Sequence, residues 1–273
     1  GMRPSGLPSA TRAAVRRCLP ELSMRSVDPV PAGLAYPGGG IFFWWQAGAT
    51  SALSRLYELD RVPCVGTSAG ALAATLASCE VEMDDALSVA ARLSEERDLW
   101  TRGAWGLYGI WGGMVREWLA ELLPEDSARR TSGRLHLVIK RAPRLQRPWL
   151  QPLMISDFTS KGDLIDANLA SAHVPLFLDG RWTTQFRGMR CVDGSLSLRR
   201  SSGERRVVLP NGARVVRLDP KTDQRMREKY RRREDFLRLT SRGGVEEMMG
   251  WGEAYVNLMA SRGDLKLLEP FLR

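Results

Sequence analysis

Twice near its beginning, the chain passes from a short apolar run through glycines into a long apolar stretch. The first occurrence runs from 34–36 through Gly38-Gly39-Gly40 to an apolar stretch that ends near residue 59. The second runs from 62–65 through Gly66-Thr67-Ser68-Ala69-Gly70 into an Ala- and Leu-rich stretch. A strand, a glycine turn and a helix repeated in this order predict an α/β fold with a parallel sheet.

The remaining patterns extend this architecture along the chain. Helices are expected over 41–59, 71–79, 84–96, 111–123, 160–170, 222–240 and 245–262. Strands are expected over 135–140, 152–156, 189–192, 207–209 and 215–218. We therefore expect a three-layer α/β fold with a mainly parallel central sheet flanked by helices.

The domain organisation follows from composition. The first 33 residues are rich in Arg and hydroxyl side chains, and Glu21 and Asp28 are their only acids. This composition is typical of an organelle transit peptide or a disordered leader. We expect a leader at 1–33, a main α/β domain at 34–220 and a helical extension at 221–273 packed on the same domain.

The overall composition disfavours several classes of protein. Apolar residues make up 44% and charged residues 26%, as in a folded globular protein. No uncharged apolar run reaches about 18 residues, so any membrane contact is expected to be peripheral. The four cysteines form no C-x-x-C pair, and His136 and His173 are the two histidines. Neither a disulfide framework nor a zinc site is therefore predicted.

The pentapeptide around Ser68 fits the pattern G-x-S-x-G. A nucleophile on a sharp strand-to-helix turn needs small flanking residues, here Gly66 and Gly70. The start of the following helix favours negative charge that develops near such a nucleophile. The alternative is an ordinary strand–helix turn in which Ser68 caps the helix.

The turn Gly38-Gly39-Gly40 can direct several backbone N–H groups to one point, as an oxyanion hole requires. Such a turn also suits phosphate, but the nucleotide patterns need a third spaced glycine or a lysine. Position 43 is Phe43, and no lysine follows the turn. With a candidate nucleophile thirty residues later, the oxyanion interpretation is favoured over a plain tight turn.

No histidine is placed to activate Ser68. His136 lies within an expected strand, and His173 precedes the late aspartate instead of following it, unlike in α/β-hydrolases. Asp193 ends an apolar run and is followed by Gly194. Burial would raise the pKa of this carboxyl and make it a better base, although an Asp-Gly pair alone is usually a turn.

These features together resemble the patatin-like phospholipases: an oxyanion glycine run, a G-T-S-A-G elbow and a late Asp-Gly without a catalytic histidine. Further motifs resemble the adipose triglyceride lipase subgroup, namely SGRL at 132–135, ISDFTSK at 155–161, DLIDAN at 163–168, ASAHVP at 170–175, GMRCVDG at 188–194 and GWGEA at 250–254. The resemblance covers nearly everything from about residue 33 onward.

The resemblance implies a role for each candidate residue. Ser68 would be the nucleophile, Asp193 its base, Gly38, Gly39 and Gly40 the oxyanion donors, and Gly66 and Gly70 the elbow. The resemblance makes 34–220 a patatin-like catalytic domain. The implied activity is hydrolysis of fatty-acyl esters, in triacylglycerol or in phospho- or galactolipid, through an acyl-serine and without a cofactor or metal.

Two departures from the family pattern lie near the site. Phe42-Phe43 stands where the family has a further glycine, often after a basic residue. Ser195 and the residues after it stand where the family usually has a glycine or alanine and an Asn-x-Pro stretch. These departures leave open a second interpretation, a catalytically weak or inactive patatin-like protein that binds lipid.

Positive charge is concentrated late in the chain. The segment 199–242 has 15 Lys plus Arg and 6 Asp plus Glu, which accounts for the whole net charge of +9. Beside the lipid substrate, this segment predicts an anionic membrane or lipid-droplet surface as a partner, with an activator protein as an option and no nucleic acid. The alternative is a solvated basic face without a partner. The expected location is cytoplasmic and peripheral, with a plastid or another organelle as the alternative.

Overall fold

The computed structural model describes residues 32–103, 106–143, 149–196, 208–232 and 234–273. The compact unit that contains these residues spans Pro31–Arg273. The expected leader lies outside the described residues except at its end, because the first strand begins at Ala32 and includes Gly33. Among the described residues, no helix combines the length and the hydropathy needed to span a bilayer.

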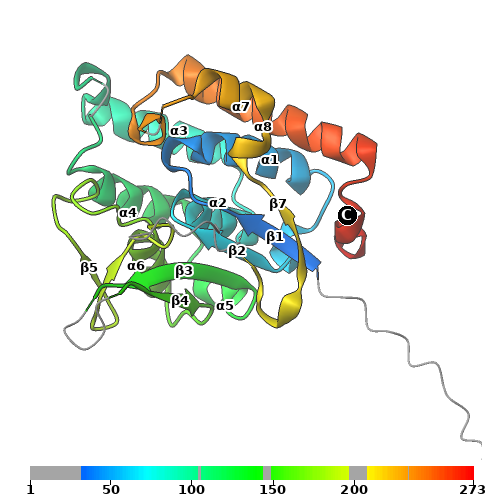
Figure 1. Ribbon diagram of the computed structural model, residues 1–273, viewed down its shortest axis with the longest axis horizontal. Coiled ribbons are helices and arrows are strands. Elements are labelled where there is room, and N and C mark those ends of the chain that lie inside the picture. The colour runs from blue at the N-terminus through cyan, green and yellow to red at the C-terminus, as the bar shows by residue number, and fades with distance from the viewer. Residues whose placement is uncertain (1–31, 104–105, 144–148, 197–207, 233) are drawn as a thin grey trace, which may run out of the picture. The chain divides into compact units, whose positions relative to one another are not determined.

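The core of the protein is a seven-stranded mixed sheet (Figure 1). Its strands are β1 Ala32–Tyr36, β2 Cys64–Thr67, β3 Leu135–Arg141, β4 Gln151–Ile155, β5 Thr184–Phe186, β6 Met189–Val192 and β7 Arg214–Arg217. The order is β5-β6-β3-β2-β1-β7, and β4 also pairs with β3. β7, β1, β2 and β3 are parallel, whereas β4, β5 and β6 are antiparallel to their neighbours.

The helices flank this sheet in successive layers. They are α1 Phe43–Ser54, α2 Ala69–Ser78, α3 Met83–Glu96, α4 Trp111–Leu122, α5 Ser127–Thr131, α6 Lys161–Ser171, α7 Gln224–Lys229 and α8 Arg242–Arg262. α2 packs on β1 and β2, α6 packs on β3, and α1 separates α2 from α8. The predicted α/β fold, with a mainly parallel central sheet flanked by helices, is confirmed.

Alternation along the strands divides the interior into two clusters. Leu34, Cys64 and Leu137 face the large cluster that the helices share. Ala35 and Val65 point to the opposite face and pack with Leu209. Successive side chains of a strand point to opposite faces, so both faces of the central strands are buried and read as continuous apolar runs.

The helices α1 and α8 pack closely and meet through glycines. A Cβ added at Gly48 of α1 would lie 1.9 Å from the carbonyl oxygen of Met249, and one at Gly252 of α8 would lie 1.9 Å from that of Trp45. No side chain larger than glycine fits such a close approach of two helix backbones. The C-terminal helix is thereby seated directly against the first helix after the glycine turn.

Two expected elements are wrong. The basic helix expected over 222–240 ends at Lys229. Further on, the Asp235 carboxylate accepts a hydrogen bond from the N–H of Arg232, and a short 3-10 turn occupies Asp235–Leu237. A local side-chain bond to the backbone competes with the helical pattern there. Of the strand expected over 207–209, residue 207 lies outside the described residues, and Val208 and Leu209 form no ladder and run into Pro210.

Candidate active site

Ser68 occupies the turn between β2 and α2. Its φ of 55° lies in the left-handed region, which is rare for a residue with a side chain and marks local strain. A Cβ at Gly66 would lie 2.4 Å from the carbonyl oxygen of Gly70, and one at Gly70 would lie 2.1 Å from that of Tyr36. Both positions therefore require glycine, and the turn has the geometry of a nucleophile elbow.

A side chain from the end of α6 holds the elbow in place. The backbone N–H of Ser68 donates to the hydroxyl of Ser171 at 2.9 Å. That hydroxyl donates in turn to the carbonyl of Val138 in β3 at 2.7 Å. The strained residue is thus tied to two other elements of the core, which is the kind of support that such a backbone conformation needs.

The strand pairing brings Asp193 to the same place. β2 and β6 both pair with the edge of β3 opposite β4: Thr67 is the partner of Val138, and Val192 is the partner of Lys140. β2 runs parallel and β6 antiparallel to β3, so their carboxyl ends meet. The residues that follow them are Ser68 and Asp193.

The backbone of Asp193 and Gly194 is fastened to the end of α6. The N–H of Asp193 donates to the carbonyl of His173 at 2.8 Å, and the N–H of Gly194 donates to that of Ser171 at 2.9 Å. Ser171 therefore contacts the backbone on both sides of the site, through its hydroxyl and through its carbonyl.

Asp193 is buried, with 1% of the residue exposed. Burial raises its pKa, since the charged form loses hydration, while hydrogen bonding from Ser195 and Ser68 and the charge of Lys140 act in the opposite direction. Oδ1 accepts from the N–H of Ser195 at 2.7 Å. Oδ2 is buried and has no partner of acceptable geometry among the described residues, although Ser68 lies close enough to stabilise the charge.

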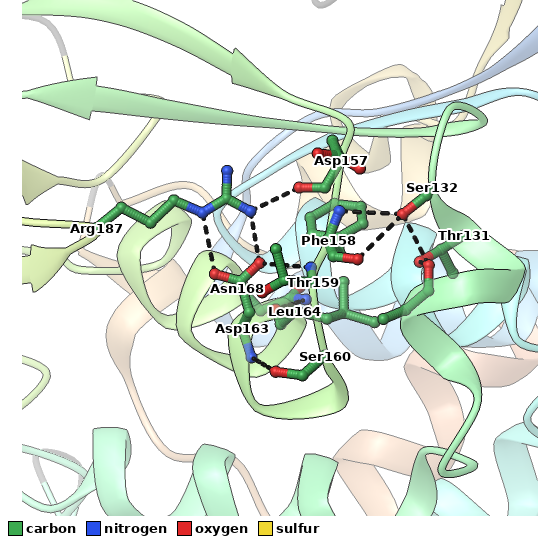
Figure 2. A network of polar contacts seen from close by, with 11 residues as sticks. Thr131, Ser132, Asp157, Phe158, Thr159, Ser160, Asp163, Leu164, Asn168 and Arg187 are labelled. Atoms are coloured by element: carbon green, nitrogen blue, oxygen red, sulfur yellow. Dashed lines mark hydrogen bonds and ion pairs between the residues drawn. The ribbon is translucent and has the colours of Figure 1, made fainter.

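A polar cluster at the start of α6 secures the hairpin that leads to Asp193 (Figure 2). Arg187, in the turn between β5 and β6, binds both oxygens of Asp163 at 3.0 and 2.5 Å and the carbonyl of Asp157 at 2.7 Å. The Arg187 guanidinium holds the pKa of Asp163 below its usual range. Ser160 caps α6 by accepting from the N–H of Asp163 at 3.1 Å.

The glycine turn lies against the elbow. A Cβ at Gly38 would come within 3.0 Å of the Ser68 Cβ, and one at Gly70 would lie 2.6 Å from the carbonyl oxygen of Pro37. Gly39 precedes the 3-10 turn Gly40–Phe42, and Gly40 has a φ of 53°. Gly38 of this turn and Ser68 are therefore neighbours, and the oxyanion role of the three glycines stays a prediction.

An apolar pocket opens beside Ser68, which is 6% exposed. Its lining is almost entirely aliphatic and aromatic and includes Phe43, Trp44, Leu72, Leu87, Leu99, Trp111, Met114, Trp118, Phe177, Phe236, Leu237 and Leu239. Such a lining accommodates hydrocarbon and excludes water.

Neither histidine side chain forms a hydrogen bond with Ser68 or Asp193 in the described part of the chain. His173 is fully buried and its Nε2 lies 3.2 Å from the carbonyl oxygen of Arg181. Burial lowers the pKa of both His173 and His136. The residues flanking His173, Ala172 and Val174, line the pocket, while His173 contributes its carbonyl to Asp193.

Several functional neighbours have no separate signal in the sequence. Ser171 lies 103 residues from Ser68, inside a motif that suggested only family membership. Ser195 reads as a departure from the family, and its bond to Asp193 is visible only in three dimensions. Phe236 covers the glycine turn, since a Cβ at Gly40 would lie 2.0 Å from the Phe236 carbonyl oxygen.

The sequence model of the patatin-like phospholipase family matches residues 34–199, which is more than half of the chain. The chain belongs to the patatin-like phospholipase family. The resemblance seen in the motifs is confirmed. In this family member, Ser68, Asp193 and the glycine turn all lie within the matched span, whereas the pocket residues from Phe236 onward lie outside it.

Three curated relatives show the range of this family. The omega-hydroxyceramide transacylase of Homo sapiens is 34% identical over 175 residues, 62% of this chain and 32% of that protein. The 1-acylglycerol-3-phosphate O-acyltransferase of Mus musculus is 29% identical over 167 residues, 60% and 39% of the two chains. Patatin-like phospholipase domain-containing protein 2 of Homo sapiens is 32% identical over 171 residues, 60% and 32%. The present chain thus spans less than two fifths of each relative.

Proposed function

We propose that this protein cleaves fatty-acyl esters of lipids, in triacylglycerol or in phospho- or galactolipid, with Ser68 as the nucleophile and Asp193 as its base. The observation that carries the proposal is the meeting of a strained serine and a buried carboxylate beside an apolar pocket. A carboxyl with a raised pKa is the better proton acceptor, which suits a site where neither histidine side chain bonds to Ser68 or Asp193.

In the first half of the reaction, the Ser68 Oγ attacks the ester carbonyl carbon and its proton passes to Asp193. The carbonyl oxygen becomes an oxyanion, for which the N–H groups of Gly38, Gly39 and Gly40 are the candidate donors. Collapse of the tetrahedral intermediate breaks the ester bond, and the leaving alcohol takes the proton from Asp193. The acyl group remains on Ser68 as an ester.

In the second half, water attacks the acyl-serine and gives a proton to Asp193. A second tetrahedral intermediate collapses, the fatty acid leaves, and Asp193 returns the proton to Ser68. Proton transfers balance over the cycle, so no metal or cofactor is needed.

Transfer of the acyl group to an alcohol is the second candidate. Ser68 is only 6% exposed and faces an apolar pocket, where a lipid with a free hydroxyl group competes well with water for the acyl-serine. Two relatives bear the names transacylase and acyltransferase. Adding a monoacylglycerol during turnover and quantifying new ester against free acid by mass spectrometry distinguishes transfer from hydrolysis.

Peripheral docking of the basic segment on anionic lipid is part of the same proposal. Exposed arginines of the segment, Arg227, Arg231 and Arg232, support it. Other cations there are already paired, Arg225 with Asp223 and Lys229 with Glu247, so the docking charge is smaller than the segment's composition suggests. The cytoplasmic location, the organelle alternative and a need for an activator protein remain expectations from sequence.

The decisive test is hydrolysis of a nitrophenyl acyl ester by the wild type, Ser68→Ala and Asp193→Asn, with the exposed pair Ser261→Ala and Asp264→Asn as matched controls. We expect activity to vanish in the first two variants and to persist in the controls. Survival of activity in Ser68→Ala would overturn the proposal. A wild type that neither turns over esters nor reacts with a fluorophosphonate would favour the lipid-binding alternative.

A further inference from the structure

Ser195 makes two hydrogen bonds to one oxygen of Asp193. Its backbone N–H donates to Oδ1 at 2.7 Å, and its hydroxyl donates to the same oxygen at 2.5 Å. Oδ2 is buried and unpartnered among the described residues. The two carboxylate oxygens are therefore in unlike environments, and rotating the carboxyl would break both bonds to Oδ1.

Ser195 also lies within the site. A Cβ built on Gly38 would be 3.0 Å from the Cβ of Ser68 and 3.1 Å from the Oγ of Ser195. The two serines therefore flank the same glycine of the candidate oxyanion turn. The carbonyl of the next residue, Leu196, accepts a hydrogen bond from Lys140 of β3, which ties the segment down beyond Ser195.

We propose that Ser195 is a positioning residue that occupies Oδ1 of Asp193 and leaves Oδ2 as the oxygen available to the Ser68 hydroxyl. The inference rests on the proposed function, in which Asp193 acts as the base. The positioning role would explain why a serine stands at position 195, where the family pattern has glycine or alanine.

The electrostatics of the site agree with this role. Burial raises the pKa of Asp193, and the hydrogen bonds of Ser195 lower it, together with Ser68 and the Lys140 ammonium. On the α6 side lies His173, whose own pKa is lowered by burial, so it brings no positive charge near neutral pH. Removing the Ser195 hydroxyl therefore raises the pKa of Asp193, and its basic form is lost at higher pH than in the wild type.

The test compares the wild type, Ser195→Ala and the matched control Ser261→Ala in the full chain. The readouts are the rate of fluorophosphonate labelling of Ser68 and kcat/KM for a nitrophenyl ester, both measured across pH. We expect Ser195→Ala to label about tenfold more slowly on the acid side of the profile, to move its acidic limb to higher pH, and to keep KM. Superimposable profiles for Ser195→Ala and the wild type would overturn the inference.

Different results would overturn the proposed function of Ser68 and Asp193 and the positioning role of Ser195. Absent labelling of Ser68 in the wild type, or labelling that Asp193→Asn leaves intact, would remove the proposed function and the inference with it. Loss of labelling in Asp193→Asn, combined with a Ser195→Ala pH profile that matches the wild type, would overturn the inference alone. Because a pH profile compares rates within one variant, a smaller folded fraction of Ser195→Ala does not imitate the expected shift, and Ser195→Gly supplies a second variant without the hydroxyl.

Discussion

The backbone N–H of Ser68 donates a hydrogen bond to the hydroxyl of Ser171, 103 residues further along the chain. The same hydroxyl reaches Val138 of β3, and the carbonyl of Ser171 accepts from Gly194. One residue at the end of α6 thus connects the turn at Ser68 to the backbone of Gly194, next to Asp193. A site whose members lie far apart in sequence is held together by a residue that needs no part in the chemistry.

Replacing Ser171 by alanine should leave the buried N–H of Ser68 without a partner. We expect the free energy of unfolding to fall by about 1–3 kcal/mol. We also expect kcat to fall about 10–100-fold, since the strained serine is no longer held in position. Chemical denaturation and ester hydrolysis measure the two effects. Wild-type kcat in a folded Ser171→Ala variant would contradict this account of the elbow.

The buried Asp193 predicts opposite effects on activity and stability. Its folded pKa is raised above the unfolded value, so the stability it contributes is present below the unfolded pKa and is lost as pH rises through the folded pKa. Near neutral pH, Asp193→Asn should therefore abolish turnover yet raise the free energy of unfolding by about 0.5–2 kcal/mol. Thermal unfolding checks this, with Asp264→Asn as the exposed control. A less stable Asp193→Asn would show that the ionised carboxylate helps to hold the fold.

The acidic limb of the rate profile reports the same group. In the proposed mechanism Asp193 accepts the Ser68 proton only when it is ionised, so kcat/KM should fall as pH decreases through the folded pKa of Asp193. Because burial raises that pKa, we expect the limb above the range of an exposed aspartate. Steady-state rates across pH measure it. A limb at the pH of an ordinary aspartate would place the carboxyl in contact with solvent.

The elbow glycines can be tested against a glycine in open space. A Cβ at Gly70 would lie 2.1 Å from the Tyr36 carbonyl oxygen, whereas one at Gly113 of α4 meets nothing within 4 Å. Gly70→Ala should lose about 1–3 kcal/mol of stability, and Gly113→Ala should gain about 0.5–1 kcal/mol because alanine favours the helix. Denaturant midpoints provide the comparison. Equal stability of the two variants would mean that the elbow can move aside.

The C-terminal segment should influence the choice of acyl chain. Leu239 lines the pocket although it lies beyond the residues that match the family. A tryptophan there fills space that a long chain would occupy, so the ratio of long-chain to short-chain ester hydrolysis should fall about tenfold in Leu239→Trp. Leu258→Trp, at a 45% exposed position on α8, is the control. An unchanged ratio would place the acyl chain elsewhere.

Short sequence patterns were sufficient to predict the secondary-structure elements around the site. The elbow glycines, the aspartate after an apolar strand and the helix capped by Ser160 are local features, and strand, turn and cap chemistry is read over a few residues. The basic stretch at 222–240 shows the limit of such reading. Its composition suits a helix, yet the structure ends the helix at Lys229 and turns at Asp235.

By itself, the sequence determined the α/β class and the family and singled out Ser68 and Asp193 as candidate nucleophile and base, because each depends on short runs with their own chemistry. Only the tertiary structure decided how Ser68 and Asp193 meet. β2 and β6 reach the same edge of β3 from opposite directions, and that pairing is set by long-range backbone hydrogen bonds. The contacts of Ser171, Ser195 and Phe236 follow from the same packing, and neighbours so distant in sequence leave no local pattern.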